Sequence, residues 1–323
     1  MDKLFIHIGP HKTGSTYIQK MFFGNRDKLR EYGICYPPDL DGPFSLWGHH
    51  NLVWSIQNRL ENSVDELVSQ FERINILSSE NFEYLTESEV LFFANKISSF
   101  NIELIYLKRC YSELLVSNWQ EDIKHGSHQS WQDFLASHFL QPFQSPILNS
   151  SIVIKRWSSI IDFSKIHIVD YDLLMSYDLD ISEFCLQNIV GLKSPLDHSK
   201  TIINRSMEYA AVELLRMLNL KVKLTGKTVD HNVRNIFNTF FKNEDTDLIN
   251  SLNIIRQNLA LFTMEDIYSC EPMEQYFESQ FDFKRGAINY GKKSYALPSE
   301  MVPFIPALEE SVDALLLKIL TQL

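Results

Sequence analysis

A glycine-rich loop with chemically active side chains lies near the N-terminus, in the stretch IHIGPHKTGST at residues 6–16. A phosphate-binding P-loop has the pattern G-x-x-x-x-G-K-[ST], and Gly9 and Gly14 have the same separation. Ser15 stands where the P-loop lysine would be, and the nearest lysine, Lys12, lies three positions earlier. The spacing predicts a loop that binds a phosphate-like group against the N-terminus of the following helix.

Two more candidate groups directly follow predicted strands. Glu80 comes after the run ILSS, and Arg109 comes after IYLK, with Ser117 eight residues later in the next predicted helix. Ligands of parallel sheets bind outside the carboxyl ends of the strands, so the loop, Glu80 and Arg109 are expected at one edge. A positioned carboxylate can accept a proton there, and a guanidinium can bind an anion.

Each of these groups also has a structural interpretation. Lys12 could be an exposed loop lysine, Arg109 could form a structural ion pair, and Ser117 could simply lie on a helix face. Glu80 could cap a helix or pair with a basic residue.

The elements that must position these groups follow from apolar periodicity. Short apolar runs at 3–8, 73–79, 102–108 and 165–170 are each followed by a helical pattern. The predicted helices cover about 15–29, 86–100 with Thr86 and Glu89 as a capping box, a segment containing 112–124, and a segment near 180–189. This alternation predicts an α/β fold with a parallel sheet and helices on both faces.

The remaining segments complete one predicted domain over residues 1–323. The segment 37–60 begins as a loop and gives a helix near His49, whereas 206–260 and the tail 311–323 have helical patterns. The stretch 282–294 is expected to be a basic loop. Without an internal repeat or a clear linker, residues 200–323 are interpreted as a mainly helical C-terminal portion.

Composition limits the function classes. The 323 residues carry a net charge of −11, which argues against a nucleic-acid binder, because such proteins need broad positive surface. An anionic ligand would need a local basic pocket. The start lacks a signal-peptide pattern, and no stretch approaches the roughly 18 apolar residues of a membrane span. Four scattered cysteines suggest neither disulfides nor a zinc site, so a cytoplasmic protein without a metal is expected.

Three stretches resemble one enzyme family. HIGPHKTGSTYIQ resembles the 5′-phosphosulfate loop of sulfotransferases that use 3′-phosphoadenosine 5′-phosphosulfate (PAPS), and RCYSELLVS resembles their 3′-phosphate motif. INILSSENF is similar to the strand that ends in the catalytic glutamate of heparan-type carbohydrate sulfotransferases. Weaker similarity to this family, bacterial members included, continues at 33–37, 156–174 and 204–206, so about two-thirds of the chain is covered.

The resemblance implies a P-loop-kinase-like fold and a set of roles. The donor PAPS would be bound by His11, Lys12, Thr13, Gly14, Ser15 and Thr16 at its 5′-phosphosulfate and by Arg109 and Ser117 at its 3′-phosphate. Lys12 would meet the bridging oxygen that gains charge as the sulfuryl group leaves, and Glu80 would be the base. Sulfuryl carries less charge than phosphoryl, so this chemistry does not require magnesium. The expected acceptor is a hydroxyl of a carbohydrate or small metabolite, less readily an amine.

Other residues are candidates for the acceptor side and for a lid. His49 and His50 open a helix and could line an acceptor pocket or lie on the surface, and Lys124 could help to position an acceptor. His11 is an alternative acid or base. A lid could come from Lys284, Arg285, Lys292 and Lys293, although the family's lysine-glycine-arginine signature is absent.

Two rival functions are weighed. A nucleoside or nucleotide kinase is disfavoured because the Walker lysine is missing and only Asp170 is placed to bind magnesium. A non-catalytic nucleotide-binding module is disfavoured by the presence of Lys12 and Glu80. The sequence leaves open the acceptor, the choice between O- and N-sulfation, the oligomeric state and the lid.

Overall fold

The computed structural model describes residues 1–44, 47–192, 207–258, 262–263, 270–281, 283–284, 294–295 and 305–323. The chain divides into two compact units. Unit 1 comprises Met1–Cys110, Asn149–Ile203 and Met273–Ile288, and unit 2 comprises Tyr111–Leu148, Asn204–Pro272 and Asn289–Leu323. The expectation that residues 1–323 form a single domain stays a prediction.

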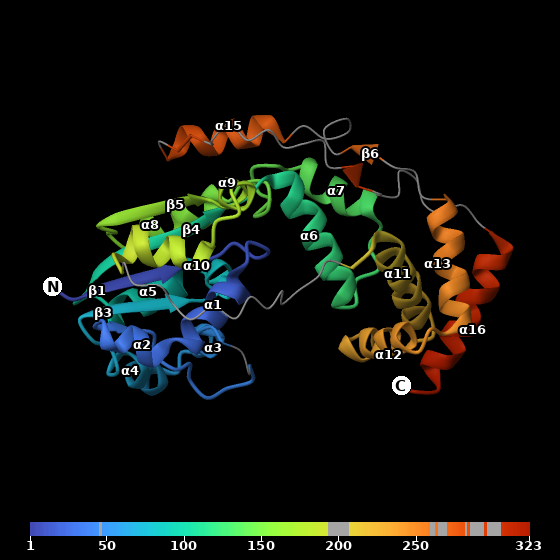
Figure 1. Ribbon diagram of the computed structural model, residues 1–323, viewed down its shortest axis with the longest axis horizontal. Coiled ribbons are helices and arrows are strands. Elements are labelled where there is room, and N and C mark those ends of the chain that lie inside the picture. The colour runs from blue at the N-terminus through green and yellow to red at the C-terminus, as the bar shows by residue number, and fades with distance from the viewer. Residues whose placement is uncertain are drawn as a thin grey trace. The chain divides into compact units, whose positions relative to one another are not determined.

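A five-stranded, fully parallel sheet forms the centre of unit 1 (Figure 1). Its strands are β1 (Lys3–His7), β2 (Ile34–Cys35), β3 (Ile74–Ser78), β4 (Asn101–Lys108) and β5 (Lys165–Asp170), in the order β2-β3-β1-β4-β5. The central strand β1 pairs with β3 and β4, and its last residue, His7, lies opposite Ser78 and Ile105. The four strands expected from apolar runs are confirmed. The two-residue strand β2 was not predicted, because so short a segment gives no periodic signal.

Helices cover both faces of this sheet, as predicted for the α/β fold. They are α1 (Ser15–Gly24), α2 (Arg26–Glu31), α3 (His50–Gln57), α4 (Glu61–Val68), the 3-10 helix η1 (Glu80–Tyr84), α5 (Glu87–Lys96), α8 (Ser151–Ser158), α9 (Tyr171–Ser176), α10 (Ile181–Phe184), the π-helix η2 (Cys185–Val190) and most of α15 (Glu271–Gln280). Successive strand side chains point to opposite faces. Phe5 therefore packs in one apolar cluster with Phe22 of α1, whereas Ile6 packs in another with Phe93 of α5.

Local sequence signals explain how two of these helices begin and end. The predicted capping box is confirmed: Thr86 Oγ1 accepts the Glu89 N–H at 3.4 Å, and Glu89 Oε2 accepts the Thr86 N–H at 2.7 Å. The helix expected over 15–29 is interrupted at Asn25, which ends α1 and precedes α2. The Asn25 side chain donates to the Met21 carbonyl, so it competes with the helical backbone at this position.

Unit 2 is mainly helical in its described residues. Its elements are α6 (Tyr111–Lys124), α7 (Trp131–Phe139), α11 (Tyr209–Leu224), α12 (His231–Lys242), α13 (Thr246–Asn258), α16 (Pro306–Leu320) and an antiparallel pair, β6 (Phe262–Thr263) with β7 (Ser294–Tyr295). Helices α11, α13 and α16 lie side by side (Figure 1). Asn219 of α11 donates to the carbonyls of Ile123 and Ser127, which fixes α11 against the end of α6.

Two further properties concern the described part of the chain. Cys35, Cys110, Cys185 and Cys270 all lie within it, and none forms a disulfide. Among the helices of the described ranges, none combines the length and the apolar character needed to cross a membrane.

Candidate active site

The loop between β1 and α1 turns sharply at the carboxyl end of the central strand. Its backbone is left-handed at Lys12, with φ 67°, and at Gly14, with φ 79°. Gly14 adopts this conformation readily because it has no Cβ. Helix α1 begins at Ser15 without a side-chain cap and without an acidic residue in its first turn. The unpaired N–H groups of this helix end therefore suit an anion in the loop.

The side chains of this loop divide into those that support it and those that suit a ligand. Thr13 is buried and its Oγ1 donates to the Pro10 carbonyl at 2.7 Å, so its side chain holds the loop together. Ser15 Oγ is buried, and in the described part of the chain it has no hydrogen-bond partner. A phosphosulfate oxygen would satisfy that hydroxyl, so the residues present fit the donor implied by the sequence.

Arg109 joins the end of β4 to this loop. Its Nη1 donates to the Lys12 carbonyl at 2.5 Å, and its guanidinium lies over the Tyr171 ring, 5.4 Å from the centroid. The Asp172 carboxylate is 4.0 Å from Nε, at the outer limit of an ion pair. Arg109 thus supports the left-handed turn at Lys12 while its side chain remains partly exposed at the strand end.

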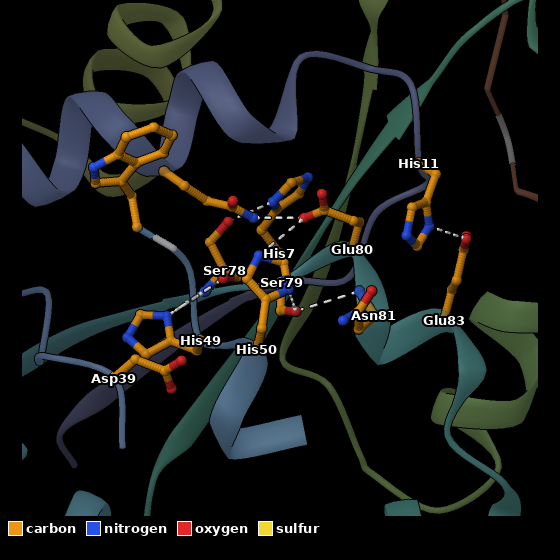
Figure 2. Close-up of polar contacts among 12 residues, drawn as sticks. His7, His11, Asp39, His49, His50, Ser78, Ser79, Glu80, Asn81 and Glu83 are labelled. Atoms are coloured by element: carbon orange, nitrogen blue, oxygen red, sulfur yellow. Dashed lines mark hydrogen bonds and ion pairs between the residues drawn. The ribbon is translucent and has the colours of Figure 1, made fainter. Parts of the chain in front are cut away.

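Glu80 begins η1, two residues after the end of β3, where the sequence places it (Figure 2). Gln19 of α1 donates its amide to Glu80 Oε2 at 2.6 Å, and His50 Nε2 is 3.9 Å from the same oxygen. Burial raises the pKa of the Glu80 carboxyl, but His50, His11, its own backbone N–H and Gln19 together lower it below its usual range. The side chain is 14% exposed, so an ionised carboxylate remains reachable.

The alternative that His49 and His50 lie on the surface is wrong, because both residues are buried. His49 Nδ1 accepts the Ser78 backbone N–H at 3.0 Å, and Nε2 donates to the Pro37 carbonyl at 3.0 Å. Both ring nitrogens of His49 therefore bind backbone. His50 Nδ1 is 3.0 Å from Ser79 Oγ, which turns its Nε2 towards Glu80. These histidines shape the setting of Glu80, and their contact with an acceptor stays a prediction.

His11 occupies the same neighbourhood from the loop side (Figure 2). Its Nδ1 contacts Glu83 Oε1, and its ring lies 5.0 Å from the ring of Tyr84. Burial lowers the pKa of His11, but the hydrogen bond and negative charge of Glu83, with smaller contributions from Glu80 and Asn81, raise it overall. His11 is therefore held by η1 beside Glu80, and its role toward the donor stays a prediction.

Sequence analysis missed three residues that contact this group: His7, Gln19 and Glu83. Gln19 lies on the buried face of α1, and Glu83 lies one turn after Glu80 in η1. His7 gave a usable signal, because a histidine inside the run LFIHI is a polar residue in a predicted buried strand. A buried polar side chain beside a candidate loop calls for a partner.

Some predicted residues lie elsewhere. Ser117 and Lys124 belong to α6 in unit 2, where Lys124 pairs with Glu121 at 3.4 Å, so their place beside the donor or acceptor stays a prediction.

Of the proposed lid, Lys284 is exposed, and Arg285, Lys292 and Lys293 lie outside the described residues, as does the weak similarity at 204–206. Within the described ranges no cluster of three or more His, Cys, Asp or Glu side chains suits a metal ion.

Comparisons with known proteins find a likeness among solved structures alone. No protein-family model and no curated protein matches this chain. Among solved structures, a sulfotransferase from Alicyclobacillus acidocaldarius matches 70% of this chain and 96% of its own chain, with 13% identity and a TM-score of 0.39. A TM-score this low supports no argument about function, so function is inferred from the residues of this chain.

Proposed function

We propose that this chain is a sulfotransferase that moves a sulfuryl group from PAPS to an acceptor hydroxyl. The observation that carries the proposal is one edge of the parallel sheet, where three groups meet. These groups are an uncapped helix N-terminus with the buried Ser15 hydroxyl, the Arg109 guanidinium and the ionised Glu80 carboxylate. An anion cradle beside a base suits transfer of an anionic group to a hydroxyl.

The loop would bind the 5′-phosphosulfate through the backbone N–H groups of Gly14, which precedes α1, and of Ser15 and Thr16 at its start, and through the Ser15 hydroxyl. The Lys12 ammonium would meet the bridging oxygen, which gains negative charge as the sulfuryl group leaves. Arg109 would bind the 3′-phosphate. Because Arg109 also holds the Lys12 carbonyl, it would link the 3′-phosphate to the loop that grips the 5′ end.

Glu80 would accept the proton of the attacking hydroxyl. The acceptor oxygen forms a bond to sulfur, the bond from sulfur to the bridging oxygen breaks, and adenosine 3′,5′-bisphosphate (PAP) leaves with that electron pair. A base must be ionised before it reacts, and the lowered pKa of Glu80 keeps it so at neutral pH. Gln19 and His50 both contact Oε2, which fixes the orientation of the carboxylate.

The surroundings of Glu80 suit a carbohydrate or a small metabolite as acceptor. The two histidines near the carboxylate each contact an exposed aromatic ring: His11 contacts Tyr84, which is 58% exposed, and His50 contacts Phe44, which is 40% exposed. Binding sites for small molecules combine aromatic surface with a few positioned polar groups. A ring-shaped acceptor with hydroxyl groups would meet both here.

A specific contact weakens the kinase alternative. Asp170, which the sequence offered as the magnesium ligand, caps α9 by accepting the Leu173 backbone N–H at 3.0 Å. A capping carboxylate is held by its helix and is less available to a metal. The non-catalytic alternative leaves unexplained why Glu80 is kept ionised and partly exposed.

Ligand binding tests the donor class. PAP should raise the thermal unfolding temperature far more than AMP or ATP with magnesium, because a ligand that binds only the native state stabilises it. Arg109→Ala should erase most of that preference, whereas the exposed Arg30→Ala should keep it. Equal stabilisation by ATP with magnesium would favour the kinase.

Turnover tests the base. Glu80→Gln preserves shape but removes the basic oxygen, so sulfuryl transfer from PAPS to a panel of saccharides should fall by about a hundred- to ten-thousandfold. PAP binding should stay near normal, and Glu87→Gln, an exposed carboxyl at the start of α5, should have no effect on either. Normal turnover of Glu80→Gln, with loss in His11→Gln, would assign the base to the histidine.

A further inference from the structure

His7 is a buried imidazole that the proposed reaction does not yet use. It ends β1, is 2% exposed, and has Nδ1 2.8 Å from Ser78 Oγ. Its other ring nitrogen, Nε2, is buried and has no hydrogen-bond partner in the described part of the chain. A buried polar atom without a partner costs stability, so its presence calls for an explanation.

The available hydrogen-bond partners place the proton of the neutral His7 ring on Nε2. Burial lowers the pKa of His7 to about 4, against a smaller opposing effect of Glu80, so the ring is neutral at pH 7 with one N–H. If Nδ1 carried the proton, it would donate to Ser78, and both the Ser78 hydroxyl hydrogen and the Nε2 lone pair would lack partners. If Nε2 carries it, Ser78 donates to Nδ1 and one group alone, the Nε2 N–H, lacks a partner.

The position of this N–H follows from strand register. His7 pairs with Ser78 across β1 and β3, so their side chains lie on one face of the sheet. The donor loop begins two residues after His7, and Glu80 lies two residues after Ser78. The His7 ring and the Glu80 carboxylate interact electrostatically and lie side by side in Figure 2. The N–H therefore belongs to a ring that lies beside the proposed base, at the strand end from which the proposed phosphosulfate loop starts.

We propose that His7 is a further catalytic residue, a neutral donor whose Nε2 N–H binds an oxygen of the sulfuryl group during transfer. The inference rests on the proposed function. In an in-line displacement the attacking and leaving oxygens lie on opposite sides of sulfur, next to Glu80 and Lys12 respectively. A donor beside Glu80, on the strand that leads into the loop of Lys12, would face the remaining sulfuryl oxygens. In a water-poor site such a prearranged donor stabilises developing charge, and an uncharged ring does so without neutralising Glu80.

Two substitutions distinguish the role of Nε2 from that of Nδ1. His7→Asn places an amide near the Nδ1 position, which keeps a contact with Ser78 but removes the Nε2 donor. His7→Gln places an amide N–H near the Nε2 position. We expect kcat of His7→Asn to fall about a hundredfold, the typical effect of removing one such donor, and His7→Gln to recover part of it. Affinity for PAP, which lacks the sulfuryl group, should stay near that of the wild type in both.

A measurement on the wild-type protein covers the case in which neither variant folds. Long-range 1H–15N NMR distinguishes the two neutral histidine tautomers, and His7 should carry its proton on Nε2. Addition of PAPS should shift the Nε2 N–H resonance, whereas PAP should leave it nearly unchanged. A proton on Nδ1, or a resonance that responds equally to both nucleotides, would overturn the proposal.

The outcomes also separate this inference from the proposed function. Normal PAP binding with full turnover in His7→Asn overturns the role of His7 and leaves the sulfotransferase intact. A wild-type protein that binds neither PAP nor PAPS overturns the sulfotransferase and the role of His7 with it.

Discussion

Lys12 combines a candidate catalytic side chain with an unfavourable backbone conformation. A left-handed φ of 67° costs a residue with a Cβ about 1–2 kcal/mol relative to the right-handed region. The Arg109 bond to the Lys12 carbonyl helps to hold this conformation. Glycine would remove the cost, so lysine at this position is best explained by what its side chain does.

Two substitutions that both delete the ammonium should therefore differ in stability. Lys12→Gly should be about 1 kcal/mol more stable to urea than Lys12→Ala, because alanine keeps the strained Cβ. Both should lose about a hundredfold or more in turnover. Arg59, also left-handed at φ 56° and remote in sequence from the loop, is the control: its Gly and Ala variants should differ in stability but keep full turnover. Equal stability of the two Lys12 variants would show that the loop relaxes.

At the scale of elements, three of them position the proposed base, Glu80. Glu80 belongs to η1, Gln19 to α1 and His50 to α3. The segment before α3 restricts the position of the Gln19 side chain. A Cβ built on Gly48, two residues before α3, would lie 2.5 to 2.8 Å from the Gln19 amide atoms. Close approach of the chain at Gly48 therefore holds the Gln19 amide against Glu80.

A methyl group at Gly48 should consequently disturb the base. Gly48→Ala should push the flexible Gln19 amide away from Glu80, and the loss of that donor should raise the carboxyl pKa. Glu80 would then protonate at higher pH, so the acid limb of the kcat/KM profile should move to higher pH, and turnover at pH 5 should fall below that of the wild type. Turnover at pH 8 should change little.

Gln19→Leu should reproduce this shift. Gly24→Ala is the control, since a Cβ there meets nothing within 4 Å and alanine favours the helix. If the acid limb of Gln19→Leu lies at the same pH as that of the wild type, Gln19 does not lower the pKa of Glu80.

The sequence predicts the elements better than it predicts their contacts. The apolar runs at 3–8 and 73–79 locate two strands, and parallel pairing then brings the candidate donor loop and Glu80 to one edge. Nothing local predicts that Gln19 meets Glu80, 61 residues away, or that His7 meets Ser78, 71 residues away. Those contacts depend on strand register and on the rotation of α1, which only the assembled core fixes.

Burial of the histidines was harder still to foresee. His49 follows a loop rich in proline and glycine, and such segments usually lie at the surface. Its two ring nitrogens instead join Pro37 of that loop to Ser78 of β3. A side chain that satisfies distant backbone groups leaves no periodic signal in the sequence.

At the scale of the whole molecule, buried titratable groups connect stability to pH. Burial lowers the pKa of His7 and of His49 to about 4, from 6.5, and raises the pKa of Asp39 to about 6, from 3.8. Between pH 4 and 6.5 the unfolded chain binds more protons at the two histidines, which makes stability rise with pH. Asp39 acts in the opposite direction between pH 3.8 and 6, where the folded carboxyl still binds a proton that the unfolded one has released.

Urea unfolding across pH 4 to 7 should show this balance. His49→Gln should lower the slope of unfolding free energy against pH by about one proton, or about 1.4 kcal/mol per pH unit, between pH 4 and 6.5. Asp39→Asn should make the slope steeper, because it removes the opposing group. A slope that His49→Gln leaves unchanged would mean that the ring is protonated in the native state.

The central place of β1 has a kinetic consequence. Both neighbours of this strand come from far along the chain, at 74–78 and 101–108, and α1, which continues from the loop, packs on the sheet that these strands complete. Long chain closures must occur before such parallel pairs form, which makes them slow steps in folding. A refolding chain should gain its helices early and the loop between β1 and α1 only after β3 and β4 have docked on either side of β1.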